Sequence, residues 1–424
     1  MNSETSGPRT FDPLAFRDLF PPKLAEIRYF DNACVTVPLL TVIDAYQQHC
    51  LNVFGCDRGM YYHSYLIDRE ILHAREQIGR LINAEHPTEE IVFLLNGTQA
   101  LNTVLKGFPW KPKDKILTTE MEHNSLETPI RQLAKEMQLQ ILRIPFRRGM
   151  IDPADVEEIL TEHPDIRMIA LAEMDNIFGR VRPIEQICRL AHSIGIKVLV
   201  DGAQTLMHMR IDVQRTGADF QTFSMHKGFG LPGVGVLYIK KPYGIRLIRP
   251  LITGGGTVAS EESPEQFLEM PNRFEAGIRN VPAILASAKA VPVLMEYREA
   301  GMLDYLEELT RYTFARLSEI HGIYFLDEDT TRVYHGFVVF GIRGLPSRDV
   351  GVMLDELARC CVRVGAQCQT VYFTKLRASE LQMKPQQNET ESKQETFLVR
   401  ISLAPYNTKE EVDVLYQTLQ DLIG

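Results

Sequence analysis

Short apolar runs alternate with helix-like segments along the first two-thirds of the chain. Residues 68–84 place Ile71, Ala74, Ile78 and Leu81 at the spacing of one helix face, and the next run, EEIVFLLNG (89–97), is continuously apolar. Similar runs follow at 114–120, 139–146, 166–174, 195–203 and 233–241. Runs of this kind are typical of strands buried on both faces. Their alternation with helices predicts an α/β fold with a mostly parallel sheet covered by helices on both sides.

The pattern changes after about residue 281. Residues 281–302 predict a long helix with a proline interruption, and strand and helix candidates follow up to a final helix over 408–424. Thr408 and Glu411 have capping-box spacing at its start. We expect an N-terminal segment (1–28), a large domain (29–290) and a smaller C-terminal α+β domain (291–424). The polar, low-complexity segment 379–396 is expected to be a mobile surface loop.

Composition narrows the function classes. A chain of 424 residues with 45% apolar content suggests about two globular domains. The net charge of −9 argues against nucleic-acid binding. No apolar stretch reaches the roughly 18 residues that span a bilayer, and the N-terminus lacks a signal-peptide pattern, so we expect a cytoplasmic protein. The seven cysteines are odd in number and form no C-x-x-C pair, which predicts neither a disulfide framework nor a metal site.

Polar residues follow the apolar runs where the ligands of parallel α/β sheets bind. Gly97 and Thr98 come after one run and open a helix, which predicts a phosphate seat; an ordinary turn with a Thr cap is the alternative. Asp201 ends another apolar run. A carboxylate there is either a helix cap or the partner of a positively charged ring nitrogen.

The segment TFSMHKGFG (222–230) places Lys227 at the end of a further strand. A partly desolvated lysine near other cations loses its proton easily and can form a Schiff base with a carbonyl; a plain surface lysine is the alternative. A phosphate seat, an aspartate and a Schiff-base lysine together are what pyridoxal phosphate needs. We therefore expect this cofactor, with Ser224 and His226 as further phosphate contacts.

The segments DGAQ (201–204) and DFQTFSMHKGFGLPGVGVLYIKK (219–241) resemble the signature of the class V aminotransferase family of fold-type I pyridoxal-phosphate enzymes. Within that family the chain resembles the cysteine desulfurase and selenocysteine-lyase-like branch. The resemblance extends over most of the chain, through YFDNACVTVP (29–38), EMEHNS (120–125), EMDNIFGRVRPI (173–184), ITGGGT (252–257), RFEAGIRN (273–280) and VRISLAPYNTKEEVD (399–413).

The resemblance implies roles for individual residues. His123 would stack on the pyridine ring and handle protons. Asn176 would contact the phenolic oxygen of the cofactor and the substrate, Gln204 would also bind the cofactor, and Arg400 would grip the substrate carboxylate. A homodimer is implied, because in this family the site is completed across the subunit interface.

The segment RVGAQCQT (363–370) resembles the desulfurase stretch that carries a nucleophilic cysteine. Cys368 would then be the nucleophile, with Arg363 nearby to favour its thiolate. The implied reaction converts L-cysteine to L-alanine and leaves a persulfide on Cys368, which passes to an acceptor protein.

Family membership does not fix the reaction. An aminotransferase, lyase or epimerase acting on another amino acid needs no catalytic thiol, and a non-catalytic cofactor-binding protein is a third alternative. Cys34 follows the Asp-Asn-Ala sequence (31–33), near the expected substrate entrance. It is either a reactive thiol or a packed small side chain.

Overall fold

Seven strands form the central sheet of the computed structural model, which describes residues 10–146, 150–241, 247–260, 263–325, 335–372, 374 and 398–423. Strand β8 pairs antiparallel with both of its neighbours, and the other neighbouring strands are parallel. In spatial order the strands are β2 (Ile91–Leu94), β8 (Gly235–Ile239), β7 (Phe220–Ser224), β6 (Lys197–Asp201), β5 (Ile166–Ala172), β3 (Lys115–Thr118) and β4 (Gln140–Arg143). The predicted mostly parallel α/β sheet is confirmed.

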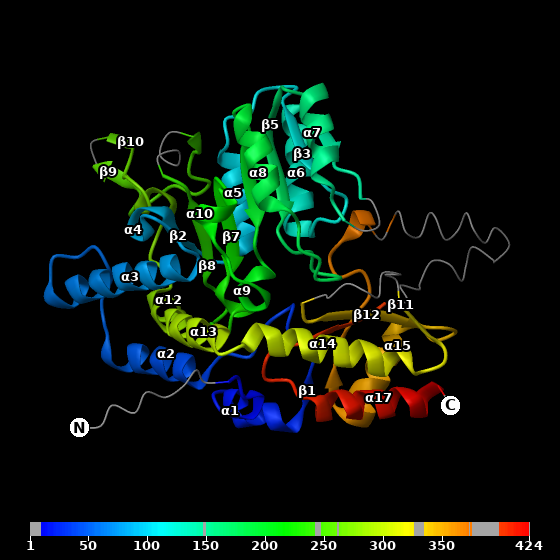
Figure 1. Cartoon of the computed structure of the whole chain (residues 1–424). Helices are drawn as coiled ribbons and strands as arrows, with labels where there is room; N and C mark the ends of the chain where they lie inside the picture. Colours follow the sequence, from blue (N-terminus) through cyan, green and yellow to red (C-terminus); the bar gives the residue numbers. More distant parts are fainter. Residues whose placement is uncertain are drawn as a thin grey trace.

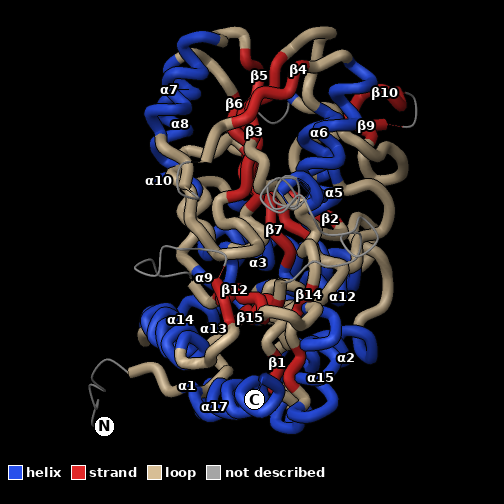
Figure 2. Tube along the Cα trace, turned by 90° about the vertical axis from the view of Figure 1, so that its right-hand side faces the viewer, coloured by secondary structure: helices blue, strands red, loops and turns tan. Residues whose placement is uncertain are grey.

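Helices cover both faces of this sheet (Figure 2). On one side lie α5 (Gly97–Gly107) and α6 (Asn124–Met137), and on the other α7 (Pro153–Glu162) and α8 (Ile184–Ser193). Successive side chains of a strand point to opposite faces. Leu199 of β6 therefore packs in the cluster with α5 and α6, whereas Val198 and Val200 pack with α7 and α8. Burial on both faces explains why the strands are continuously apolar in sequence.

A second, antiparallel sheet lies toward the C-terminal end of the chain (Figure 1). Its order is β11 (Ile323–Phe325), β12 (Phe337–Ile342), β15 (Val399–Ser402) and β14 (Arg363–Val364). Helices α14 (Met302–Ser318), α15 (Ser347–Ala358) and α17 (Lys409–Ile423) pack with it in one apolar cluster. The predicted capping box of the last helix is confirmed, because Glu411 N–H donates to Thr408 Oγ1 and Thr408 N–H donates to Glu411 Oε2.

The predicted long helix over 281–302 is two helices, α12 (Val281–Ala288) and α13 (Ala290–Glu299). Pro292 has no N–H to bond the carbonyl of Ala288, and its ring would clash there, so α12 ends at Ala288.

The remaining elements are α1 (Pro13–Arg17), η1 (Pro22–Glu26), β1 (Arg28–Tyr29), α2 (Leu40–Asn52), α3 (Tyr62–Leu81), α4 (Pro87–Glu90), α9 (Thr205–His208), α10 (Val213–Thr216), η2 (Met225–Lys227), β9 (Val258–Ser260), β10 (Ser263–Phe267), η3 (Asn272–Phe274) and β13 (Cys360–Cys361). Over the described ranges, none of the helices combines the length and the apolar character that crossing a bilayer requires.

The N-terminal segment contacts both the large-sheet region and the region around the small antiparallel sheet. Strand β1 pairs in parallel with β13, and Arg17 donates to the carbonyl of Tyr406 and forms an ion pair with Glu411. Phe16 of α1 packs against Phe229, which lies two residues after the end of η2. The domain boundaries at 28/29 and 290/291 stay predictions, and the predicted loop 379–396 lies outside the described residues.

A buried ion pair connects α3 to the segment before α12. Arg75, which is 1% exposed, donates two bonds to the carboxylate of Glu275, at 2.8 and 2.6 Å. Burial opposes ionisation of Glu275, but the neighbouring Arg75 and Arg279 hold its pKa below the ordinary value. Glu275 also accepts the N–H of Phe93, so the pair anchors the edge strand β2.

We expect Arg75→Ala to lower the free energy of unfolding by about 3–5 kcal/mol, because it removes one of the two arginines that pair with the buried carboxylate of Glu275. Urea denaturation measures the change. Arg311→Ala is the control, since Arg311 pairs with Glu307 on the surface of α14 and such pairs contribute about 0.5 kcal/mol. Equal losses in the two variants would contradict the role of the buried pair.

Candidate active site

The strand ends of the large sheet open into a cavity of about 310 Å³. Every predicted site residue lines it, from helices, strands and loops that are far apart in sequence: Gly97, Thr98, His123, Asn176, Asp201, Gln204, Ser224, His226, Lys227, Arg363, Cys368 and Arg400. The structure thus brings the whole predicted set together. Cys34 lines the same cavity.

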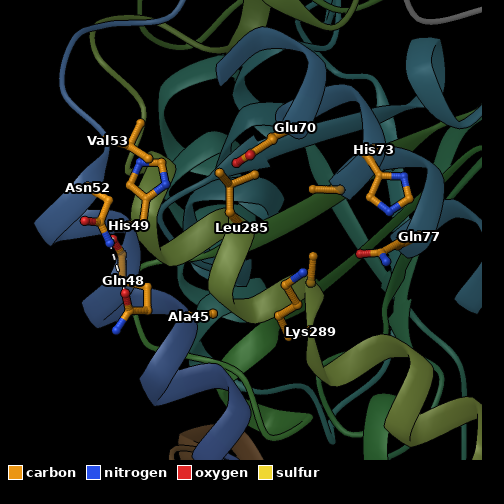
Figure 3. A pocket seen from close by; sticks show the side chains of 12 residues that line it. Ala45, Gln48, His49, Asn52, Val53, Glu70, His73, Gln77, Leu285 and Lys289 are labelled. Carbon is orange, nitrogen blue, oxygen red and sulfur yellow. Dashed lines mark hydrogen bonds between the residues drawn. The ribbon is translucent and has the colours of Figure 1, made fainter. Parts of the chain in front are cut away.

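A second cavity, of about 500 Å³, lies between α2, α3 and α12 (Figure 3). Gln48, His49, Glu70 and Lys289 are among the side chains that line it. It contains none of the predicted site residues and lies away from the carboxyl ends of the strands, where ligands of α/β sheets bind. The smaller cavity is therefore the candidate active site.

The start of α5 forms an anion seat at one end of the candidate cavity. Asn96 caps this helix by accepting the N–H of Gln99, so the alternative of a cap by Thr98 is wrong. The N–H of Gly97 donates to Ser224 Oγ at 2.8 Å, which joins the seat to the end of β7. A helix N-terminus with free N–H groups and a positive dipole end favours phosphate.

Asp201 and Lys227 provide a buried acid and a buried base in the same cavity. Asp201 is 3% exposed, and burial raises the pKa of its carboxyl group. A buried carboxylate is stabilised by a cationic partner. Lys227 Nζ donates to the carbonyl of Ala33 at 2.7 Å, and burial, assisted by the positive charge of Arg400, lowers its pKa to about 8. Its amine is therefore partly neutral, and nucleophilic, near neutral pH.

The reactivity of Lys227 should follow this lowered pKa. Only the neutral amine reacts, so labelling by an amine-directed acylating reagent should rise with pH through a midpoint of about 8 in the cofactor-free protein. Peptide mapping measures the rate at Lys227, with exposed Lys106 mapped in the same digest. A midpoint for Lys227 near the ordinary lysine value of 10.5 would contradict the desolvated environment.

Two histidines on the cavity wall are neutral at physiological pH. Burial, together with the charge of Lys227, lowers the pKa of His123 and of His226 to about 4. His123 caps α6 through Nδ1, which accepts the N–H of Ser125 at 3.1 Å. Its Nε2 therefore carries the proton, and its neutral ring suits stacking on an aromatic ligand. Within the described part of the chain, the buried Nδ1 of His226 has no hydrogen-bond partner.

Arg400 lies on β15 of the small sheet and forms part of the cavity wall, where it is 3% exposed. Its Nη2 pairs with Asp31 at 3.0 Å and its Nη1 donates to the carbonyl of Asn176. Asp31 also lies 3.5 Å from Arg363, which is exposed. The sequence did not identify Asp31 as a site residue, although the resemblance includes the Asp-Asn-Ala sequence that begins with it. Its carboxylate orients the guanidinium groups of both arginines.

Cys368 is exposed at the cavity rim, on a tightly turned segment. Gln367 and Cys368 have φ values of +51° and +59°, a region that costs energy for non-glycine residues and is often found at functional sites. The carbonyl of Cys368 accepts the N–H of Asn124 at 2.8 Å. Asn176 donates to the carbonyl of Gln367 and accepts from the side chain of Gln369. Asn176, whose side-chain amide is predicted to contact the ligand, thus also holds the backbone on either side of Cys368 in place.

The sequence also did not identify a buried ion pair beside His123, between Arg182 and Glu122. Arg182 contacts Glu122 Oε1 at 2.5 Å and donates to the carbonyl of Met121 at 2.8 Å. These contacts fix the backbone just before His123 and so position its ring. The only signal in sequence was an acidic residue beside the histidine, which does not identify its partner.

Comparisons with known proteins agree with this geometry. The sequence model described as "Aminotransferase class-V" matches residues 28–415. A probable cysteine desulfurase of Methanothermobacter thermautotrophicus is 30% identical, over 95% of this chain and 96% of its own, and one of Halalkalibacterium halodurans is 32% identical with the same coverage. The solved structure of a cysteine desulfurase from Thermococcus onnurineus superposes with a TM-score of 0.87 at 26% identity, covering 98% of this chain and 99% of that one. The predicted resemblance is confirmed, and the chain belongs to the class V aminotransferase family.

Proposed function

We propose that this protein is a pyridoxal-phosphate-dependent cysteine desulfurase that converts L-cysteine to L-alanine. The observation that carries the proposal is the meeting of Lys227, Asp201, Arg400 and the thiol of Cys368 in one cavity. An aminotransferase or epimerase has no use for the thiol. The relatives that are about 30% identical over nearly the whole chain carry the name cysteine desulfurase.

The residues fit pyridoxal phosphate chemically. The N-terminus of α5 with Ser224 would hold the phosphate, and the unpartnered Nδ1 of His226 is available to it. The carboxylate of Asp201 would pair with the protonated ring nitrogen, and Lys227 would bond the aldehyde carbon. When bound, this cofactor supplies an electron sink for the bonds around the α-carbon of an amino acid.

The side chains around the substrate have separable tasks. Arg400 would bind the carboxylate of L-cysteine through its planar guanidinium, which Asp31 already orients. Lys227, with a pKa of about 8, would move the proton at the α-carbon. Together the two groups would hold the carboxylate and act on the proton at the neighbouring α-carbon.

Cys368 would take the substrate sulfur. Its thiolate attacks that sulfur and a new S–S bond forms, while the carbon–sulfur bond of the substrate breaks. The electron pair of that bond stays with the substrate carbon, which takes a proton and leaves as part of L-alanine. A persulfide remains on Cys368, and its exposed position at the rim makes it accessible to an acceptor protein.

We further infer a homodimer in the cytoplasm. Large apolar side chains are exposed between α2 and the start of α3, including Phe54, Met60 and Tyr62. Such a patch favours a protein interface, and light scattering in solution would detect the dimer. All seven cysteines are free, as expected for a reducing compartment.

Product analysis tests the proposed function. Incubation of the holoenzyme with L-cysteine and a reductant should yield L-alanine, and Cys368→Ser should yield none. Cys50→Ser is the matched control, since Cys50 is exposed on α2 outside the cavity. Release of pyruvate and ammonia, or amino transfer to a keto acid, by both the wild type and Cys368→Ser would overturn the desulfurase proposal.

A further inference from the structure

Two thiols line the candidate cavity, and the proposed reaction uses only one of them. Cys34 is partly buried on the loop between β1 and α2, whereas Cys368 is exposed at the rim. None of the other five cysteines lines this cavity within the described residues. Cys34 is therefore a nucleophilic side chain at the reaction centre without an assigned task.

The two thiols come from different walls of the cavity. Lys227 Nζ donates to the carbonyl of Ala33, so Cys34 directly follows the residue that touches the reactive amine. Cys368 is held on the wall of Asn124 and Asn176. A cavity of about 310 Å³ is at the lower end of small-ligand sites, and both thiols line it.

The charges around Cys34 suit anionic sulfur. It lies close enough to Lys227 and Arg400 to interact electrostatically with both. In the described part of the chain the buried Nε of Arg400 has no hydrogen-bond partner, and Arg400 is 3% exposed. A buried guanidinium with an unpartnered N–H stabilises a thiolate or persulfide anion near it. The cavity therefore favours sulfur transfer inside it as well as at its rim.

We propose that Cys34 is a second sulfur carrier, which takes the outer sulfur of the persulfide formed on Cys368. This inference rests on the proposed function, because that persulfide must form first. The thiolate of Cys34 attacks the outer sulfur, and a new S–S bond forms to Cys34 Sγ. The bond to Cys368 Sγ breaks, and Cys368 leaves with the electron pair and takes the proton that Cys34 released. No oxidant or reductant is consumed, and Cys368 is free for a second L-cysteine.

The amount of product formed without a reductant tests this transfer. The wild-type holoenzyme should release about two L-alanine per protomer and then stop, because both thiols fill with sulfur. Alkylation followed by peptide mapping should find one extra sulfur on each of the Cys34 and Cys368 peptides. Cys34→Ser should release about one L-alanine and carry extra sulfur on Cys368 only. Cys50→Ser, the matched control, should behave as the wild type.

Four other results separate failure of this inference from failure of the proposed function. A wild-type release of about one L-alanine, with extra sulfur on Cys368 alone, overturns the transfer and keeps the desulfurase. A disulfide between Cys34 and Cys368 with release of hydrosulfide overturns it, because Cys34 has then attacked the inner sulfur. Extra sulfur on Cys34 in Cys368→Ser also overturns it, because the order is reversed. No L-alanine from the wild type overturns the proposed function itself. The wild-type peptide map needs no variant to fold.

Discussion

Replacing Lys227 with alanine should lower the rate of L-alanine formation from L-cysteine by about 10³–10⁴-fold or more. The variant loses the amine that is proposed to bond the cofactor and to move the proton at the substrate carbon. Among the described residues that line the cavity, burial lowers the pKa of both His123 and His226 to about 4 and Arg400 is cationic, so these groups are weaker bases than Lys227. Steady-state assays with a reductant measure the loss.

Lys106→Ala is the control for Lys227→Ala. Lys106 is exposed in the last turn of α5, the helix whose N-terminus forms the anion seat, and its side chain is not among those that line the cavity. It should keep the wild-type rate within a few-fold. Thermal unfolding of both variants establishes that they are folded. A Lys227→Ala protein that retains a tenth of the wild-type rate would rule out Lys227 as the essential base.

Asp201→Asn should lower the same rate by about 10²–10³-fold, the size expected when one pre-organised charge is removed from a buried site. Asparagine keeps the shape and the bond from Ala203 N–H but removes the negative charge. Without that charge, Asp201 would lose its proposed role of keeping the ring nitrogen of the cofactor protonated. The measurement is the steady-state rate at saturating cofactor, with cofactor content determined by absorbance.

Glu173→Gln is the matched control for Asp201→Asn. Glu173 follows the neighbouring strand β5 and is also a buried carboxyl group, whose pKa burial raises to about 7, but it bonds Gln221 and does not line the cavity. Its replacement should leave the rate within a few-fold of the wild type. Equal losses in the two variants would mean that Asp201 acts only through packing.

The sheet was predictable from sequence because its strands are buried on both faces. In residues 195–203, for example, Val198, Leu199 and Val200 are apolar in succession, which is typical of a strand covered on both sides. The pairing of β1 with β13 was not predictable, because two-residue strands more than 300 residues apart leave no periodic signal. The proline interruption predicted within 281–302 is present as the break between α12 and α13, because Pro292 cannot bond the carbonyl of Ala288.

The site was predictable where its residues end strands. Gly97, Asp201 and Lys227 each follow an apolar run, and parallel strands bring such ends to one edge. The partners that orient the site were missed because they come from other parts of the fold. Asp31 reaches Arg400 from the loop after β1, and Gln369 reaches Asn176 from the turn segment after β14. Contacts of this kind depend on tertiary packing, which local sequence does not encode.

The most direct test of the account is a rapid-mixing experiment that follows L-alanine from L-cysteine without and then with a reductant. We expect the wild type to release a burst that stops when the thiols are filled and resumes when the reductant is added, and Cys368→Ser to release none. Continuous release of L-alanine or pyruvate without a reductant, at the same rate in wild type and Cys368→Ser, would contradict sulfur transfer to Cys368.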